Sequence, residues 1–164
     1  MALFRILSGS LFGRRNESGT AAIEFALFLP FLLLLLGGIV ELGFSAYEAM
    51  QVSNAVDAGA LYAAKNGWNS ASIVSATVSG AASSGLTATP APTQFCGCPN
   101  AAGSISNLGA PPCSPTACSG SPAGTYVQVS ASLNHVVIFP TMGVLPTGWG
   151  LPATFTATAV IRTN

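Results

Sequence analysis

One continuous apolar segment constrains this chain more than any other feature. Residues 20–40 contain a single charged side chain, Glu24, in a run dominated by Leu, Phe, Ala and Gly. Twenty-one helical residues rising 1.5 Å each extend about 31 Å, close to the thickness of about 30 Å of a bilayer's hydrocarbon core. The segment is therefore predicted to span a membrane, with its two flanks in different compartments.

The basic residues predict the orientation of that span. Arg5, Arg14 and Arg15 precede it, whereas Lys65 is the single basic residue within about 25 residues after it. By the positive-inside rule the N-terminus lies in the cytoplasm and the C-terminal part is exported. The predicted divisions are a basic cytoplasmic leader at 1–19, a transmembrane segment at 20–40, an exported continuation of the helix at 41–66 and a small exported α+β domain at 67–164.

The leader and span allow more than one interpretation. An ordinary cleaved signal peptide has a basic start and an apolar core of about 7–15 residues. The longer run here and the carboxylate of Glu24 inside it weigh against that interpretation. An uncleaved membrane anchor fits the length equally well.

The exported part is nearly free of charge, which excludes several classes of function. No Asp, Glu, Lys or Arg occurs among the 96 residues between Lys65 and Arg162. Nucleic-acid binding depends on Lys and Arg, and hydrolytic or metal-dependent catalysis depends on carboxylates, Lys or several His. We therefore expect no nucleic-acid partner, no enzyme activity, no cofactor and no metal. His135 is expected to be an ordinary strand residue, because no carboxylate or second His lies near it in sequence.

The helix is predicted to continue beyond the span, from about Ala21 to Ala64, over roughly 66 Å. Mostly small residues recur at alternating spacings of four and three, which predicts one buried stripe with Glu41, Glu48, Asp57 and Lys65 off it. The stripe could pack on the chain's own domain or on a neighbouring subunit. Its members are Leu42, Ala46, Ala49, Ser53, Val56, Ala60 and Ala63.

The remainder predicts an α+β domain with a two- or three-stranded antiparallel sheet. Asn66-Gly67 ends the long helix, and a second helix starts at Asn69 or Ser70 and ends near Gly85. Residues 86–124 are rich in Pro, Gly and Ser and predict a loop. Alternating patterns predict strands at 126–133, extended by 135–139, and at 154–162. The loop between them holds an apolar set that is either a contact surface or a lid: Met142, Leu145, Trp149 and Leu151.

Four cysteines lie in the predicted loop. In an exported domain an even number of cysteines indicates disulfides, and the spacing does not favour zinc. A bridge between Cys96 and Cys98 would close a strained small ring, so both are expected to pair with Cys113 and Cys118. Each bridge should contribute about 3 kcal/mol by closing a loop of about 16 to 23 residues.

The start of the span carries a family resemblance. Gly19 followed by Thr-Ala-Ala-Ile-Glu-Phe resembles the class III signal sequence of the type IV pilin superfamily. The longer run GTAAIEFALFLPFLLLLLGGIVELG is similar to the TadE-like family of minor pseudopilins in tight-adherence (Flp) pilus systems. The resemblance implies cleavage between Gly19 and Thr20 by a prepilin peptidase, with Glu24 and Phe25 at the fifth and sixth mature positions.

A physical role for Glu24 follows independently of the family. A carboxylate in hydrocarbon is costly and persists where it has a partner or a function. Cleavage after Gly19 would create an α-amine at Thr20, about one helical turn away, which could pair with Glu24 in the same chain or a neighbouring one. The alternative is that Glu24 lies at the headgroup level and is hydrated.

The sequence and the resemblance together predict a structural, non-catalytic component of a tight-adherence pilus assembly system. The implied location is the bacterial inner membrane, crossed once, with entry into the pilus left open. The implied partners are the prepilin peptidase, the major pilin, other pseudopilins and the inner-membrane assembly platform. The alternative is a permanently membrane-anchored exported module for binding or adhesion.

Overall fold

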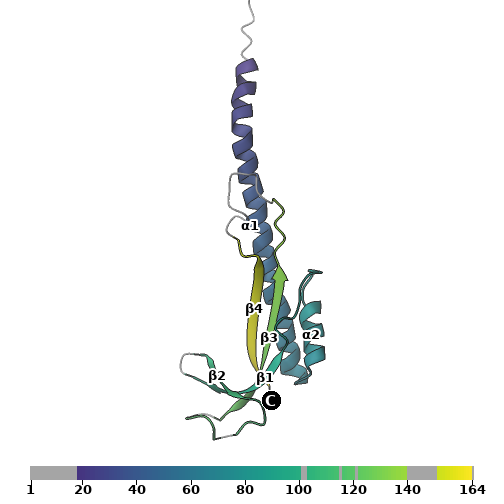
Figure 1. Ribbon diagram of the computed structural model, residues 1–164, viewed down its shortest axis with the longest axis vertical. Helices are drawn as coiled ribbons and strands as arrows, with labels where there is room; N and C mark the ends of the chain where they lie inside the picture. Colours follow the sequence, from purple (N-terminus) through teal and green to yellow (C-terminus); the bar gives the residue numbers. More distant parts are fainter. Residues whose placement is uncertain (1–17, 101–102, 115, 121, 140–150, 164) are drawn as a thin grey trace, which may run out of the picture. The chain divides into compact units, whose positions relative to one another are not determined.

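A computed structural model describes residues 18–100, 103–114, 116–120, 122–139 and 151–163 (Figure 1). The elements in chain order are α1 (Ser18–Asn66), α2 (Ser70–Ser79), β1 (Thr93–Pro99), β2 (Ile105–Gly109), β3 (Gly124–Asn134) and β4 (Thr154–Thr163). The predicted α+β class is confirmed. The leader up to residue 17, and Met142, Leu145 and Trp149 of the apolar loop, lie outside the described residues.

The long helix is continuous, as predicted. α1 has 49 residues, or about 74 Å at 1.5 Å per residue, and includes Pro30. It ends where Gly67 adopts a φ of +76°, which favours glycine, and the Gly67 N–H donates to the Ala63 carbonyl at 3.0 Å. The predicted helix end at Asn66-Gly67 is therefore confirmed.

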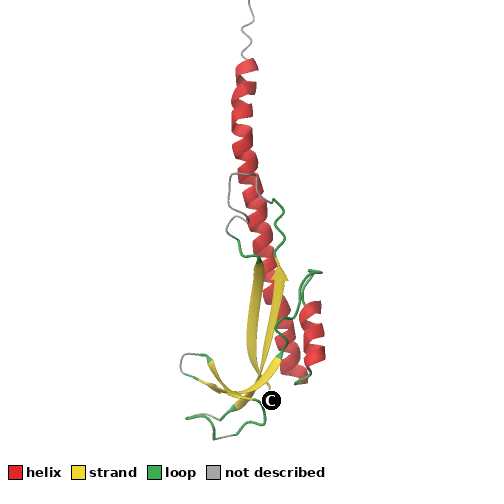
Figure 2. Ribbon diagram, in the orientation of Figure 1, coloured by secondary structure: helices red, strands yellow, loops and turns green. Residues whose placement is uncertain are grey.

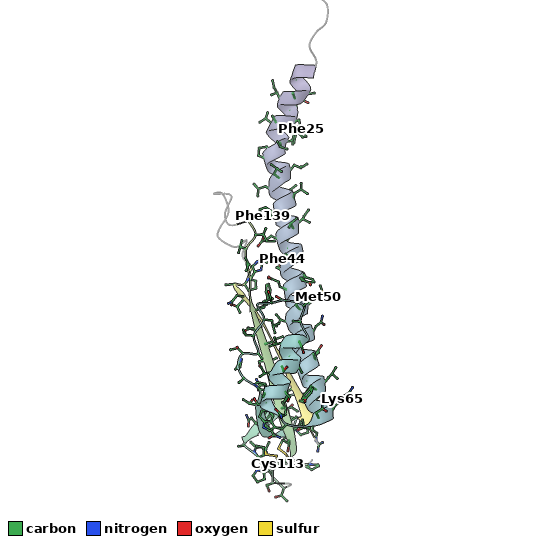
Figure 3. All side chains as sticks on the ribbon, turned by 90° about the vertical axis from the view of Figure 1, so that its right-hand side faces the viewer. Phe25, Phe44, Met50, Lys65, Cys113 and Phe139 are labelled. Carbon is green, nitrogen blue, oxygen red and sulfur yellow. A yellow bond between two sulfur atoms is a disulfide. The ribbon has the colours of Figure 1, made fainter. Side chains whose placement is uncertain are left out.

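The chain divides at Ile39 and Val40 into two compact units. In the first, the described residues form the N-terminal part of α1, and side chains project on all sides of this helix, Phe25 among them (Figure 3). Its large apolar side chains are exposed, such as Leu27 at 75% and Phe28 at 70%. The helix Gly19–Asn66 is long and apolar enough to cross a membrane by length and composition.

The second unit contains α1 from Val40 on, α2 and one antiparallel sheet with the strand order β2-β1-β3-β4 (Figure 2). β3 is central and pairs with β4 without a bulge, from Thr125 opposite Thr163 to Asn134 opposite Thr154. The side chains of β4 alternate between half-buried and exposed, as the sequence predicted. The half-buried positions are Phe155, Ala157, Ala159 and Ile161.

The core lies between the C-terminal part of α1, α2 and one face of β3. Val127, Val129 and Ala131 of β3 are fully buried, as is Ile73 of α2. Small side chains of α1 form the opposing surface, so the helix backbone approaches the sheet closely. The core residues of α1 are Val52, Ala55, Val56 and Ala63.

Several sequence-based boundaries were wrong. The predicted loop at 86–124 contains β1 and β2, which the Gly- and Cys-rich sequence conceals, so the sheet has four strands. α2 ends at Ser79, capped by Asn69 at its start, and does not reach Gly85. β3 ends at Asn134, and residues 135–139 do not extend it.

The buried stripe of α1 also differs from the predicted one. Val56, Ala60 and Ala63 are buried as predicted, but Leu42, Ala46 and Ser53 are exposed. In the first turns the buried face is rotated by one residue, so that Glu41, Ser45 and Glu48 face inward. The prediction failed because it assigned every carboxylate to solvent. From Val40 to Asn66 the buried residues of α1 are Glu41, Ser45, Glu48, Val52, Ala55, Val56, Gly59, Ala60 and Ala63.

Gly59 provides a test of this close packing. A Cβ there would collide with the Thr77 hydroxyl of α2 and lie 3.0 Å from a Val129 methyl of β3. Gly59→Ala should therefore destabilise the protein by about 1–3 kcal/mol from overpacking, reduced by about 1 kcal/mol of gained helix propensity. Chemical denaturation in detergent micelles, followed by circular dichroism, measures the change.

Gly43→Ala is the matched control, because it lies on the same helix with no atom within 4 Å of the added Cβ. It should leave stability unchanged or raise it by up to about 1 kcal/mol. A Gly59→Ala variant as stable as Gly43→Ala would contradict the packing described here.

Candidate functional site

The predicted processing residues lie in the first two turns of α1. Gly19, Thr20, Glu24 and Phe25 are all exposed in the first unit. An added Cβ at Gly19 would meet nothing within 4 Å, so the fold of this chain does not require glycine there. A requirement for Gly19 would therefore come from outside the folded chain, and its role in processing stays a prediction.

The two disulfides join β1 to the segment that precedes β3. Cys96 bonds to Cys113 and Cys98 to Cys118, which is the crossing from the CGC segment that the sequence predicted (Figure 3). Cys96 and Cys98 are two residues apart on one strand, so their side chains share a face. Gly97 between them is packed closely, since a Cβ there would collide with Ile105 and Tyr126. The bridges fix the segment between β2 and β3, which contributes little to the core.

The pairing can be tested by removing one bridge at a time. In the double variant Cys96→Ser, Cys113→Ser the remaining Cys98 and Cys118 should stay oxidised, with no thiol available to alkylating reagents in the denatured protein. Stability should fall by about 3 kcal/mol, the typical effect of a loop of this size.

The control double variant Cys98→Ser, Cys113→Ser removes one partner from each bridge and should show two alkylatable thiols by intact mass. An oxidised control, together with two free thiols in the first variant, would mean that the pairing is the reverse one.

The second unit contains a site that was not predicted. His135, the first residue after β3, lies between two carboxylates of α1. Its Nε2 is 3.1 Å from Oε1 of Glu41, and its Nδ1 is 2.5 Å from Oε2 of Glu48. Glu41 and Glu48 are seven residues apart, which places them on the same helix face two turns apart.

This cluster is shielded from solvent. The side chains of His135, Glu41 and Glu48 are 1%, 0% and 8% exposed. The Ile138 N–H approaches both oxygens of Glu41, at 3.2 and 3.3 Å, and the Phe155 ring packs edge-on against the imidazole at 5.6 Å between centroids. Buried carboxylates are tolerated when they are paired and hydrogen-bonded, and both conditions hold here.

The arrangement suits a hydrogen-bonded link between α1 and His135 rather than a metal centre. The two carboxylates contact opposite edges of the imidazole, so they do not converge with it on one point. Within the described residues no group of three His, Cys, Asp or Glu side chains is arranged to hold a metal ion. The chemistry available to the cluster is the sharing of protons between one ring and two carboxylates.

His135 was expected to be an ordinary strand residue, and this was wrong on both points: it lies outside the strand and it has two acidic partners. Glu41 and Glu48 lie 94 and 87 residues away from His135, so neither is found among its neighbours in sequence. One signal was available. Glu41 and Glu48 are seven residues apart on a helix predicted to have a buried face, and His135 is the only histidine in the chain.

Comparison with known proteins agrees with the resemblance seen at the start of the span. Residues 19–61 match the model of a family described as TadE-like protein. The match covers most of α1, from the residue before the predicted cleavage point into the buried stripe. Neither the curated proteins nor the solved structures gave a match.

Proposed function

We propose that this protein is a structural, pseudopilin-like component of a tight-adherence pilus assembly system, made as a precursor and cleaved between Gly19 and Thr20. The observation that carries the proposal is the match of residues 19–61 to the TadE-like model, because it covers the helix that such a subunit would use for assembly. The proposed role includes no reaction of its own.

The helix supports this role physically. Most of its large apolar side chains before Val40 are exposed and can contact lipid or neighbouring helices. Beyond Val40 the sheet and α2 cover part of the helix, whereas Leu42, Met50 and Leu61 are exposed by 57 to 60%. A subunit with these properties can pack laterally through α1 while its sheet remains intact.

The proposed topology follows from the charges. The arginines before the span favour an N-terminus in the cytoplasm, and the two disulfides of the C-terminal domain suit an oxidising exported compartment. The bacterial inner membrane is the proposed location. The proposed partners are the prepilin peptidase, the major pilin, other pseudopilins and the inner-membrane platform.

Processing is tested by the mass and N-terminal sequence of the protein isolated from membranes. We expect a mature chain that begins at Thr20, and we expect Gly19→Val to accumulate at full length. Gly43→Val is the matched control, since both glycines are exposed helical positions where a Cβ meets no neighbour. It should be processed normally.

An intact N-terminus in the wild type would favour the alternative, a permanently anchored binding or adhesion module. A cut beyond Val40 would instead indicate an ordinary signal peptide, and either result would contradict the proposal.

The proposed role of Glu24 requires its charge. Glu24→Ala should leave the exported domain folded but reduce incorporation into fibres by about tenfold or more. The substitution removes the proposed partner of the α-amine that cleavage creates at Thr20. An unpaired charge in the bilayer costs at least about 2.5 kcal/mol, and about 1.4 kcal/mol corresponds to tenfold. Quantitative immunoblotting of sheared fibres and of membranes, together with the processed fraction, measures the effect.

Asp57→Asn serves as the control, because Asp57 is an exposed carboxylate on the exported part of the same helix. If Glu24→Ala is processed and assembled as well as Asp57→Asn, the carboxylate has no such role.

A further inference from the structure

We propose that Glu41, Glu48 and His135 form a proton-dependent latch. When the cluster holds its two shared protons, it joins the ends of β3 and β4 to α1. When rising pH removes one of these protons, the contacts between His135 and the two carboxylates open. The proposal is independent of the role in pilus assembly, because it depends only on contacts within the second unit.

The latch joins three elements at one point. His135 immediately follows β3, and its backbone N–H donates to the Ala153 carbonyl at 2.9 Å, just before β4. Its side chain and the Ile138 N–H contact the two carboxylates of α1. Losing the ring contacts would therefore free residues 135–138 from the helix while leaving the ten β3–β4 residue pairs in place.

The geometry requires two protons among the three side chains. Each ring nitrogen faces a carboxylate oxygen, and a nitrogen and an oxygen at this separation need a proton between them. The protons can be distributed as an imidazolium with two carboxylates, or as a neutral imidazole with one protonated carboxyl. The count is two in both cases, with a net charge of −1.

The same groups hold fewer protons when they separate. An unperturbed Glu titrates near pH 4.3 and an unperturbed His near pH 6.5, so above about pH 6.5 the separated groups retain only the single N–H of a neutral imidazole. Opening then releases one proton. By linkage the ratio of closed to open latch falls by up to about tenfold per pH unit above that point, and it is level between about pH 5 and pH 6.5, where both forms hold two protons.

The surroundings of His135 contain no competing charge among the described residues. α1 contributes only Glu41 and Glu48, and β4 contributes the uncharged Phe155 ring. Arg162 lies beside Gly124 at the opposite end of β3, and Asp57 and Lys65 are exposed farther along α1. The chain has one histidine and its cysteines are bonded, so few other groups titrate near neutral pH.

Hydrogen exchange at the Ile138 amide measures the opening directly in the full-length protein in detergent micelles. We expect its protection factor, which is corrected for intrinsic exchange, to be level from about pH 5.5 to pH 6.5 and then to fall by up to tenfold per unit. The Ser132 amide, bonded to the Thr87 carbonyl at 2.8 Å, is the internal control and should keep a constant protection factor.

Glu48→Gln tests the proton count with an isosteric side chain. A glutamine amide can donate to a neutral ring nitrogen, so the contact no longer needs a shared proton and the fall in Ile138 protection above about pH 6.5 should be lost. His135→Gln should also abolish it. Asp57→Asn removes an exposed carboxylate from the same helix and should keep the wild-type profile.

Three results would overturn the latch: constant protection of Ile138 in the wild type up to about pH 9, an unchanged slope in Glu48→Gln, or a parallel loss of protection at Ser132. The last result would mean that the domain opens as a whole. Glu48→Gln keeps the test decisive if His135→Gln fails to fold.

Discussion

The second unit depends on close contact between the α1 backbone and β3. The sheet contributes Val127, Val129 and Ala131, which are fully buried, and the helix contributes valines, alanines and a glycine rather than larger side chains. Small residues bring two backbones together, which gains dispersion contacts over a large area but leaves no room for added atoms. α2 is held by the same means, because the hydroxyl of Thr77 occupies the space left by the missing side chain of Gly59.

Small residues alone would leave the helix face weakly specified, since a stripe of alanines can pack equally well in slightly rotated positions. The buried cluster supplies the missing specificity at one end. Glu41 and Glu48 tolerate burial only where His135 and the Ile138 N–H meet them, so rotating α1 by one residue would leave two carboxylates unpaired. The helix is thus fixed by apolar contacts along its length and by hydrogen bonds near Val40.

The sequence predicted what depends on local pattern. The extent of α1, its glycine end, the start of α2 at Asn69, the alternation of β4 and the cysteine crossing all follow from residues close together in the chain. It did not predict β1, because the TQFCGCP sequence lacks an alternating apolar pattern. It also missed the cluster, because residues 87 and 94 positions apart meet only after the sheet has docked on the helix.

The scarcity of charge in the sheet and its loops gives the cluster its importance. Between Lys65 and Arg162 the chain offers no carboxylate or basic group except His135, so any strong, directional contact from the sheet to α1 has to use this ring or neutral groups. Neutral hydrogen bonds contribute about 1 kcal/mol each, and those to charged groups about 1.5–3 kcal/mol. With two charge-assisted contacts on one residue, the end of the sheet nearest Val40 gains a strong attachment that depends on protonation. Among the other described residues the attachment to the helix is apolar, apart from the Ala82 N–H that donates to Oε1 of Gln51 at 2.8 Å, and neither kind of contact depends on protonation.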